Sequence, residues 1–369
     1  MNGFISIFKK ISPRWLTNYL RDRIEFRQWD AENFKKTNPY INEPDVCLYD
    51  DSPIKIGILY GSRQYHKYWI AACKELKISH QIIYLERADW MEQVETANCD
   101  VFAVWPDIKT QEIKLMFDER LRIMEEEMHL KLYPSLKEIW LYENKRVQHY
   151  WLKYHGFPIP ETKIFYDEKE AVTYLQQAEY PLVMKSNHGA SASGVYIIKN
   201  ANEAIKKAKR FLRKGYAPKS NAAGKLQKGS IYIQEYIPNS KEWRMVRIGD
   251  SYFGHGKDMS GQFHSGSGKA NWDMPPKAAF DLLIDITEKG NFTSMDVDIF
   301  EASDGRLYIN ELQTVFGNSV AKEQMKIDGI SGRYVLNENK EFIFEPGSFC
   351  EHHLCVLRIK DILTWFNEV

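Results

Sequence analysis

The sequence predicts an α/β (α+β) protein, because short apolar runs alternate with amphipathic stretches along most of its 369 residues. The runs at 54–60 and 101–105 are typical of buried strands, and the residues from 65 to 76 have helical periodicity. Strands joined by such crossover helices favour a parallel sheet. Residues 230–256 instead alternate apolar and polar side chains around short turns, which predicts hairpins. The chain is too long for one core, so we expect two or three compact units.

The composition is typical of a globular protein that does not bind nucleic acid. Hydrophobic residues make up 44% of the chain, and 50 basic residues balance 50 acidic residues. No apolar run approaches the roughly 20 residues that span a bilayer, and the N-terminal FISIF is too short for a signal peptide, so we expect a cytoplasmic protein. The five cysteines are odd in number and mostly far apart, which predicts free thiols.

Residues 1–53 are expected to form a basic amphipathic helix followed by a linker. The first 29 residues carry six basic and two acidic side chains, and Leu16, Leu20 and Ile24 form an i, i+4 stripe. Such a helix packs on the rest of the chain or on a second subunit of a homo-oligomer, or it contacts an anionic membrane surface peripherally. Three prolines between 37 and 53 favour a linker.

A hairpin with a loop of small residues is predicted at 181–200. Lys185 ends its first strand, and Gly189, Ser191 and Gly194 lie in the loop, where backbone N–H groups can approach an anion closely. We interpret this hairpin as a phosphate site. The alternative is an exposed loop with a solvated lysine.

Two further polar features accompany the hairpin. Lys145 begins a helix predicted at 144–154, and because the helix dipole disfavours a lysine there, we expect an anion at the same helix end. The stretch 257–271 is long, polar and rich in glycine, and it contains His264. A loop of that composition usually binds a ligand or is disordered.

Carboxylates interrupt two apolar strands predicted at 294–300 and 307–312. Asp296 and Asp298 share one strand face, as do Glu311 and Gln313, because side chains two apart point the same way. If the strands form a hairpin, their oxygen atoms could together hold Mg²⁺. The alternative is a solvated strand face.

The order of these features resembles the ATP-grasp fold, and within it the RimK-like carboxylate–amine ligases, over about residues 141–317. PLVMKSNHGASASGV is similar to the family's phosphate lysine and closing loop, IQEYIPNSKEWRMVRIGD to its adenine hinge and ribose acid, and INELQTVFG to its metal motif. The resemblance implies a two-lobed ATP-grasp domain with the nucleotide between its lobes. The expected divisions are 1–53, an N-terminal α/β domain at 54–140, the ATP-grasp domain at 141–320 and a C-terminal extension at 321–369.

The resemblance also implies roles for individual residues. Asp298, Glu311 and Gln313 would hold magnesium. Arg244 and Lys257 would stabilise the transferred phosphoryl group or grip the acid substrate. The residues implied for ATP binding are Lys145, Lys185, Gly189, Ser191, Gly194, Glu235, Tyr236, Ile237, Glu242, His264 and Ser265.

This sequence departs from the family pattern at several positions. Gln313 replaces an asparagine, Phe316 a proline, His264 an arginine and Gly266 an asparagine, whereas Asn144 stands where aspartate is common. The implied reaction is attack of a carboxylate on the γ-phosphate of ATP, followed by displacement of phosphate from the acyl-phosphate by an amine. The acid and amine are open among peptides, amino acids and glycans. Because of these departures, a second hypothesis is that the chain is a nucleotide-binding module without ligase activity. Because of the basic N-terminal segment, a third hypothesis is a membrane-recruited module.

The run CEHHLC at 350–355 resembles a zinc-ligand cluster, but we predict a C-terminal strand. On a strand, Cys350 and His352 would face opposite to His353 and Cys355, so the four ligands could not converge.

Overall fold

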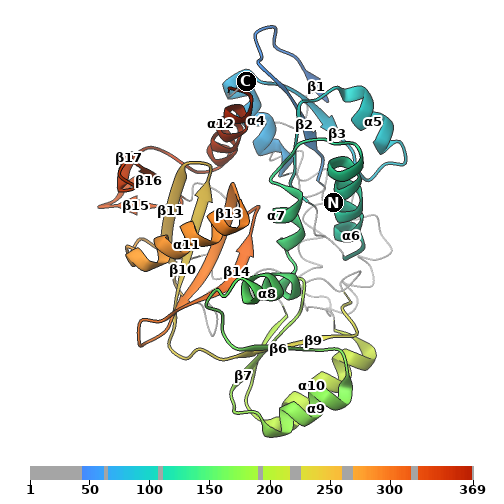
Figure 1. Ribbon diagram of the computed structural model, residues 1–369, viewed down its shortest axis with the longest axis vertical. Helices are drawn as coiled ribbons and strands as arrows, with labels where there is room; N and C mark the ends of the chain where they lie inside the picture. Colours follow the sequence, from blue (N-terminus) through green and yellow to red (C-terminus); the bar gives the residue numbers. More distant parts are fainter. Residues whose placement is uncertain are drawn as a thin grey trace, which may run out of the picture.

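The computed structural model describes residues 44–61, 65–106, 111–189, 194–216, 226–259, 269–316 and 323–367. The predicted helix within residues 1–29 and the site residues Ser191, His264 and Ser265 lie outside these ranges. Within them the strands form three sheets, each with its own covering helices (Figure 1). None of the helices in this part of the chain is long and apolar enough to cross a membrane.

The N-terminal unit is built around a five-stranded sheet in the order β1-β3-β2-β4-β5. β2, β3, β4 and β5 run parallel, as predicted, and the short β1 adds an antiparallel edge. Its strands are β1 (Val46–Cys47), β2 (Lys55–Leu59), β3 (Ser79–Ile83), β4 (Val101–Ala103) and β5 (Leu132–Tyr133). Its helices are α4 (His66–Leu76), α5 (Trp90–Ala97), α6 (Gln111–Arg122) and the π-helical turn η1 (Ile123–Glu127).

A smaller lobe contains the predicted small-residue hairpin. Its antiparallel sheet has the order β6-β9-β7-β8, with β6 (Thr162–Phe165), β7 (Leu182–Lys185), β8 (Val195–Ile198) and β9 (Ile231–Glu235). Two helices pack on it, α9 (Glu168–Gln177) and α10 (Ala201–Lys214). Both begin at side-chain caps, because Asp167 and Asn200 accept hydrogen bonds from the backbone N–H groups of Glu170 and Glu203.

The largest sheet has eight strands and forms the second lobe of the site. Its order is β14-β13-β10-β11-β16-β15, with β12 beside β11 and β17 beside β16. The strands are β10 (Lys241–Ile248), β11 (Ser251–Lys257), β12 (Ala270–Asn271), β13 (Ser294–Glu301), β14 (Leu307–Gln313), β15 (Lys326–Ile327), β16 (Ile330–Leu336) and β17 (Phe342–Pro346).

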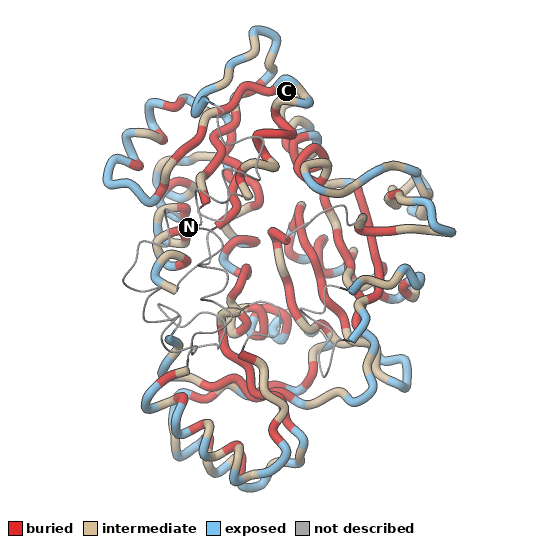
Figure 2. Tube along the Cα trace, turned by 180° about the vertical axis from the view of Figure 1, so that it is seen from behind, coloured by how far each residue is buried: buried red, intermediate tan, exposed pale blue. Residues whose placement is uncertain are grey.

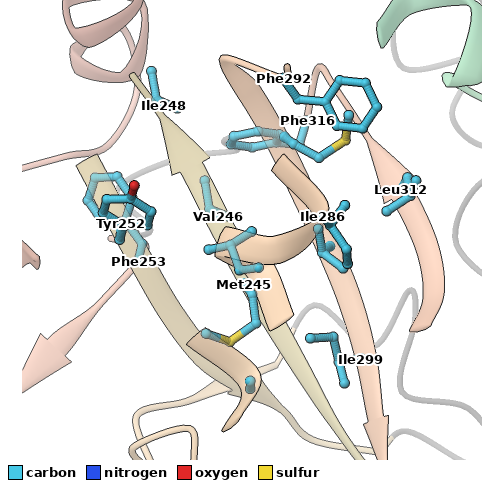
Figure 3. Close-up of a cluster of buried hydrophobic side chains, with 14 of the residues drawn as sticks. Met245, Val246, Ile248, Tyr252, Phe253, Ile286, Phe292, Ile299, Leu312 and Phe316 are labelled. Carbon is cyan, nitrogen blue, oxygen red and sulfur yellow. The ribbon is translucent and has the colours of Figure 1, made fainter. Parts of the chain in front are cut away.

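Helix α11 (Lys277–Gly290) packs against β10 and β13 of this eight-stranded sheet. Its residues Phe280, Leu283 and Ile286 share an apolar cluster with Met245 and Val297 of those strands (Figure 3). Figure 2 shows that these strands are among the most buried parts of the chain. Because one face of β10, β13 and β14 is buried in this apolar cluster, a shift of one residue in the strand pairing would expose the apolar side chains. The cluster therefore fixes the register of these strands, and with it the positions of the polar side chains on their other face.

Two helices connect the units. α7 (Leu136–Leu141) leads from the N-terminal unit into α8 (Lys145–Tyr154), which lies between the smaller lobe and the eight-stranded sheet (Figure 1). α7 begins with a capping box in which Ser135 and Glu138 satisfy each other's backbone N–H groups. Glu138 is also fully buried, and it accepts hydrogen bonds from the N–H groups of Thr293 and Ser294, so this helix is anchored to β13.

The predicted C-terminal strand is wrong, because residues His353–Asn367 form the helix α12. This helix packs against α4 of the N-terminal unit, and Cys355, Ile359 and Ile362 are buried there. The spacing of these residues is that of a helix face. The expectation rested on the six residues of CEHHLC, which are too few to show that period.

Candidate functional site

The site is built on one face of the eight-stranded sheet. Because alternate side chains point to opposite faces, Glu242 and Arg244 of β10 lie on the face opposite to Trp243 and Met245, which belong to the apolar core. In the strand register Arg244 stands beside Asp298 of β13.

The predicted carboxylate hairpin is present. β13 and β14 pair so that Asp298 stands beside Glu311, and Asp296 beside Gln313. A register irregularity follows Asp298. Asp296, Asp298 and Glu311 are all buried, so the alternative of a solvated strand face is wrong.

Ion pairs connect the charged side chains of this face. The Arg244 guanidinium places Nη2 3.0 Å from Asp296 Oδ2 and Nε 3.2 Å from Asp298 Oδ1. Lys257 Nζ lies 2.8 Å from Glu242 Oε1, and it also donates to Asp298. Asp298 thus accepts from two cations, which is the pairing that a buried carboxylate requires.

The two aspartates of β13 have opposite electrostatic environments. Burial alone would raise the pKa of Asp298, but Arg244 and Lys257 outweigh it and hold that pKa below its usual range. Burial raises the pKa of Asp296 well above its usual value, against the attraction of Arg244, and the neighbouring Asp298 carboxylate adds to the shift. Asp298 is therefore ionised, and of the two carboxyl groups Asp296 is the easier one to protonate.

Two lysines face this acidic hairpin. Lys145, the first residue of α8, has its Nζ 2.7 Å from Glu311 Oε1 and 3.0 Å from the Gly189 carbonyl oxygen. Lys185, at the end of β7, donates from Nζ to Asn310 Oδ1 at 2.8 Å. Both lysines are buried, so the alternative of a solvated Lys185 is wrong.

The lysines differ in their proton affinity. Burial lowers the pKa of Lys185 to about 8, and the positive charge of Lys145 adds to this shift. Burial also opposes the charged form of Lys145, but its ion pair with Glu311 prevails and raises its pKa. The two amines therefore lie close enough for the charge of one to affect the pKa of the other. Two amines at that separation could contact the same polyanion.

The loop after β7 is docked on the start of α8. Asn187 accepts from the N–H of Lys145 through its carbonyl oxygen at 3.2 Å and from the N–H of Arg146 through Oδ1 at 2.9 Å. These contacts use two of the backbone donors at the helix start, so the expected anion at that helix end stays a prediction that rests on the Lys145 side chain. The contact of Lys145 with an anion is left to its side chain.

A small cavity adjoins Lys145 between the two lobes. Its apolar wall includes Leu152, Ile159 and Ile309. It is lined by Lys145, Gln148, His149, Leu152, Ile159, Tyr232, Gln234, Ile309 and Asn310. A second, larger and more open cavity is lined by polar residues that include Lys185, Arg146 and Lys228.

The structure thus brings most of the predicted residues together. Lys145, Lys185, Asp298 and Glu311 converge, and Gly189 joins them through its carbonyl oxygen. Gly194 follows the loop with φ of 93°, a conformation that suits glycine. By contrast, Glu235, Tyr236 and Ile237 line neither of the two cavities, and the neighbouring Gln234 lines the smaller one.

Sequence reasoning missed two residues of the site, Asn310 and Glu143, and it missed the pairing of a third, Asp296, with Arg244. Asn310 precedes the predicted metal residue and is the partner of Lys185. Asp296 is the second carboxylate partner of Arg244, although it was considered only as a metal ligand. Glu143 accepts from the N–H of Gly189 at 3.0 Å. Glu143 could have been found from the sequence, because it is an acidic residue two positions before Lys145. The contacts of Asn310 and Asp296 depend on strand register, which the sequence does not show.

Comparison with known proteins agrees with this arrangement. The model of the phosphoribosylglycinamide synthetase ATP-grasp (A) domain matches residues 143–225, the segment that holds both lysines. D-alanine–D-alanine ligase from Bacillus anthracis, solved with ATP, superposes with a TM-score of 0.55 at 15% identity, over 85% of this chain and 99% of that one. These matches show that the chain has the ATP-grasp fold.

Two further proteins are similar to parts of this chain. A RimK-domain ATP-grasp protein from Sphaerobacter thermophilus superposes with a TM-score of 0.50 at 14% identity, over 70% of this chain and 90% of that one. The β subunit of the ADP-forming acetate–CoA ligase I of Pyrococcus furiosus is 32% identical over 111 residues. That match spans 28% of this chain and 45% of the relative, so this chain covers less than half of its length. The predicted α/β ATP-grasp fold is confirmed.

Proposed function

We propose that this ATP-grasp protein is an ATP-dependent ligase that joins a carboxylate to an amine through an acyl-phosphate, with ADP and phosphate as co-products. The observation that carries the proposal is the meeting of Lys145 and Lys185 with the carboxylate hairpin of β13 and β14. The two lysines would bind the phosphates of a magnesium nucleotide, which require cations. The carboxylates opposite them would bind its metal, which requires oxygen ligands.

The nucleotide is assigned to the space between the lobes. Its phosphates would contact Lys145 and Lys185, whose amines would leave Glu311 and Asn310 to do so. The adenine would lie on the apolar wall formed by Leu152, Ile159 and Ile309. The predicted adenine contact of the backbone from Glu235 to Ile237 and the ribose contact of Glu242 remain parts of this proposal.

The metal assignment rests on the donor set. Asp298 and Glu311 stand side by side on adjacent strands, and Gln313 follows two residues later on the same strand as Glu311. Two carboxylates and an amide oxygen suit Mg²⁺, a hard cation that prefers oxygen. When bound, the ion would neutralise phosphate charge. The chain's own contribution would be to exchange the contact between Lys145 and Glu311 for a contact of Glu311 with the metal and of Lys145 with the phosphates.

Arg244 and Lys257 are assigned to the reacting end of the nucleotide. Both are held in place by buried carboxylates, so they would stabilise developing negative charge with little reorganisation. Attack of the substrate carboxylate oxygen on the γ-phosphorus would break the bond to ADP. The amine nitrogen would then attack the acyl carbon, phosphate would leave with the bonding electrons of the C–O bond, and the nitrogen would lose a proton to phosphate or solvent to give the neutral amide.

The relatives support a ligase but differ in the groups that they join. One is named for joining two D-alanines, and another for joining acetate to coenzyme A with formation of ADP. The shared element is a carboxylate activated by ATP, and the nucleophile differs. We propose an amine, by the resemblance to RimK-like enzymes, and a cytoplasmic enzyme acting on small-molecule, peptide or glycan substrates.

The experiment is an ADP-release screen over carboxylates paired with amines. ADP formation that depends on both partners is expected. A matched set with thiols in place of amines tests the nucleophile. ATP binding without ADP release for any pair would favour a nucleotide-binding module, and absence of ATP binding would overturn the proposal.

A further inference from the structure

We propose that Glu75, His352 and His353 form a binding site for Zn²⁺ or a similar divalent cation that joins the C-terminal helix to the N-terminal unit. The site is separate from the nucleotide site. Glu75 lies in the last turn of α4, His352 directly precedes α12 and His353 is its first residue. The two helices pack together, so the three side chains meet from segments far apart in the sequence.

The ligand atoms are already gathered. His352 Nε2 lies 2.8 Å from Glu75 Oε2, and the two histidine rings have centroids 4.4 Å apart. One ligand atom from each residue lies within 4.8 Å of the other two. Bonds of about 2.0–2.2 Å in a tetrahedral site separate two ligand atoms by roughly 3.3 Å. Small side-chain rotations would therefore close the cluster on an ion.

His353 is the residue that distinguishes this cluster from a simple ion pair. Its Nδ1 is buried and has no hydrogen-bond partner among the residues that the structure describes. A buried polar atom without a partner is unfavourable, and a metal bond is one way to satisfy an imidazole nitrogen. Two imidazoles and one carboxylate are a donor set that zinc accepts, with water in the fourth position.

The helix ends alone do not create this site. The C-terminal end of α4 favours a cation near Glu75, whereas the N-terminal end of α12 disfavours one near His353. The ligands must therefore supply the affinity. The cluster also differs from the four-residue CEHHLC arrangement, because Cys355 is buried in the core shared by α4 and α12 and Glu75 is a third ligand from outside that run.

A metal at this position would act as a clamp. His352 and Glu75 are 277 residues apart in the sequence, so an ion that binds both requires α12 to be docked on α4. An ion that binds the folded chain and not the unfolded one stabilises the fold by mass action.

The test is zinc titration of the untagged full chain by calorimetry, in excess magnesium to occupy sites that prefer hard cations. We expect saturable binding of one Zn²⁺ per chain. His352→Ala, His353→Ala and Glu75→Gln should each weaken it by at least the roughly 10- to 100-fold that loss of an outer-shell partner costs. His155→Ala, at the C-terminal cap of α8, is the matched control and should bind zinc as the wild type does.

A second measurement detects the clamp itself. Zinc should raise the melting temperature of the wild type and of His155→Ala, and it should leave that of His352→Ala unchanged. Circular dichroism before titration shows whether each variant is folded, and Glu75→Gln, at an exposed position, is the variant least able to disturb folding. If folded Glu75→Gln and folded His352→Ala both bind zinc as tightly as the wild type does, the site is overturned. Absence of saturable zinc binding to the wild type would overturn it as well.

Discussion

Lys145 and Glu311 form a buried ion pair of 2.7 Å that connects the start of α8 to the carboxylate hairpin. In the proposed function each partner has another role, Lys145 on phosphate and Glu311 on the metal. Without a nucleotide the two charges satisfy each other, which avoids leaving either one buried and unpaired. Binding would replace one internal pair by two external contacts.

We expect Glu311→Gln to abolish ADP formation at any accessible magnesium concentration, because a neutral amide offers the metal one oxygen and no charge. Gln313→Asn should keep activity and change only the magnesium dependence. Magnesium titrations of ADP release measure both. An active Glu311→Gln enzyme would remove the metal assignment.

Lys185→Ala should leave the protein folded and weaken ATP binding. Charge-assisted contacts of this kind are worth about 1.5–3 kcal/mol, which corresponds to roughly 10- to 100-fold in Kd. Calorimetry of ATP binding measures the change. Lys228→Ala is the control, because Lys228 lines the larger cavity without a place in the proposed phosphate site. Unchanged ATP affinity in Lys185→Ala would argue against the phosphate role.

ATP binding should also depend on pH through Lys185. Its pKa in the folded protein is lowered to about 8, and the phosphates bind the protonated amine. Affinity should therefore be full below pH 8 and fall as the pH rises through that value. Binding near pH 8 should take up a proton, which calorimetry in buffers of different ionisation enthalpy detects. Lys185→Arg stays charged and should lose this dependence, and an unchanged pH profile in that variant would assign the titration elsewhere.

The two aspartates of β13 should respond differently to replacement by asparagine. Asp298→Asn removes the ionised partner of Arg244 and Lys257 and should cost about 3–5 kcal/mol in the free energy of unfolding. Asp296→Asn should cost less, because burial raises the pKa of Asp296 and thus opposes its charged form. Urea denaturation at neutral pH measures both. Equal losses would show that Asp296 is ionised in the folded protein.

The sequence predicted those parts of the site that depend on local pattern. The hairpin around Lys185 follows from turn chemistry, and the shared strand faces of Asp296 with Asp298 and of Glu311 with Gln313 follow from strand alternation; all are present. The partners could not be predicted in the same way. That Arg244 stands beside Asp298, or that Lys185 reaches Asn310, depends on the register of strands distant in sequence and on the packing of two lobes.

The C-terminal region shows the same limit at the level of the fold. β16 and β17 extend the eight-stranded sheet and α12 packs on the N-terminal unit, although the sequence indicated only an extension with a strand. Arg358 illustrates the reason. It is almost fully buried, and it donates to Ser294 Oγ at 3.0 Å and stacks near Phe316, so a residue that normally indicates a solvated surface is part of the interior here.

The spacing along the chain of the pairs that build the site has a consequence for folding. Lys257 and Glu242 are separated by 15 residues, and Asp298 and Glu311 belong to neighbouring strands of one hairpin, whereas Lys145 and Glu311 are separated by 166. Short loops close at a lower entropic cost than long ones. The acidic half of the site should therefore assemble early from nearby segments, and the lysine half should join last, so that the surface assigned to ATP forms where the folding chain completes its final long-range contacts.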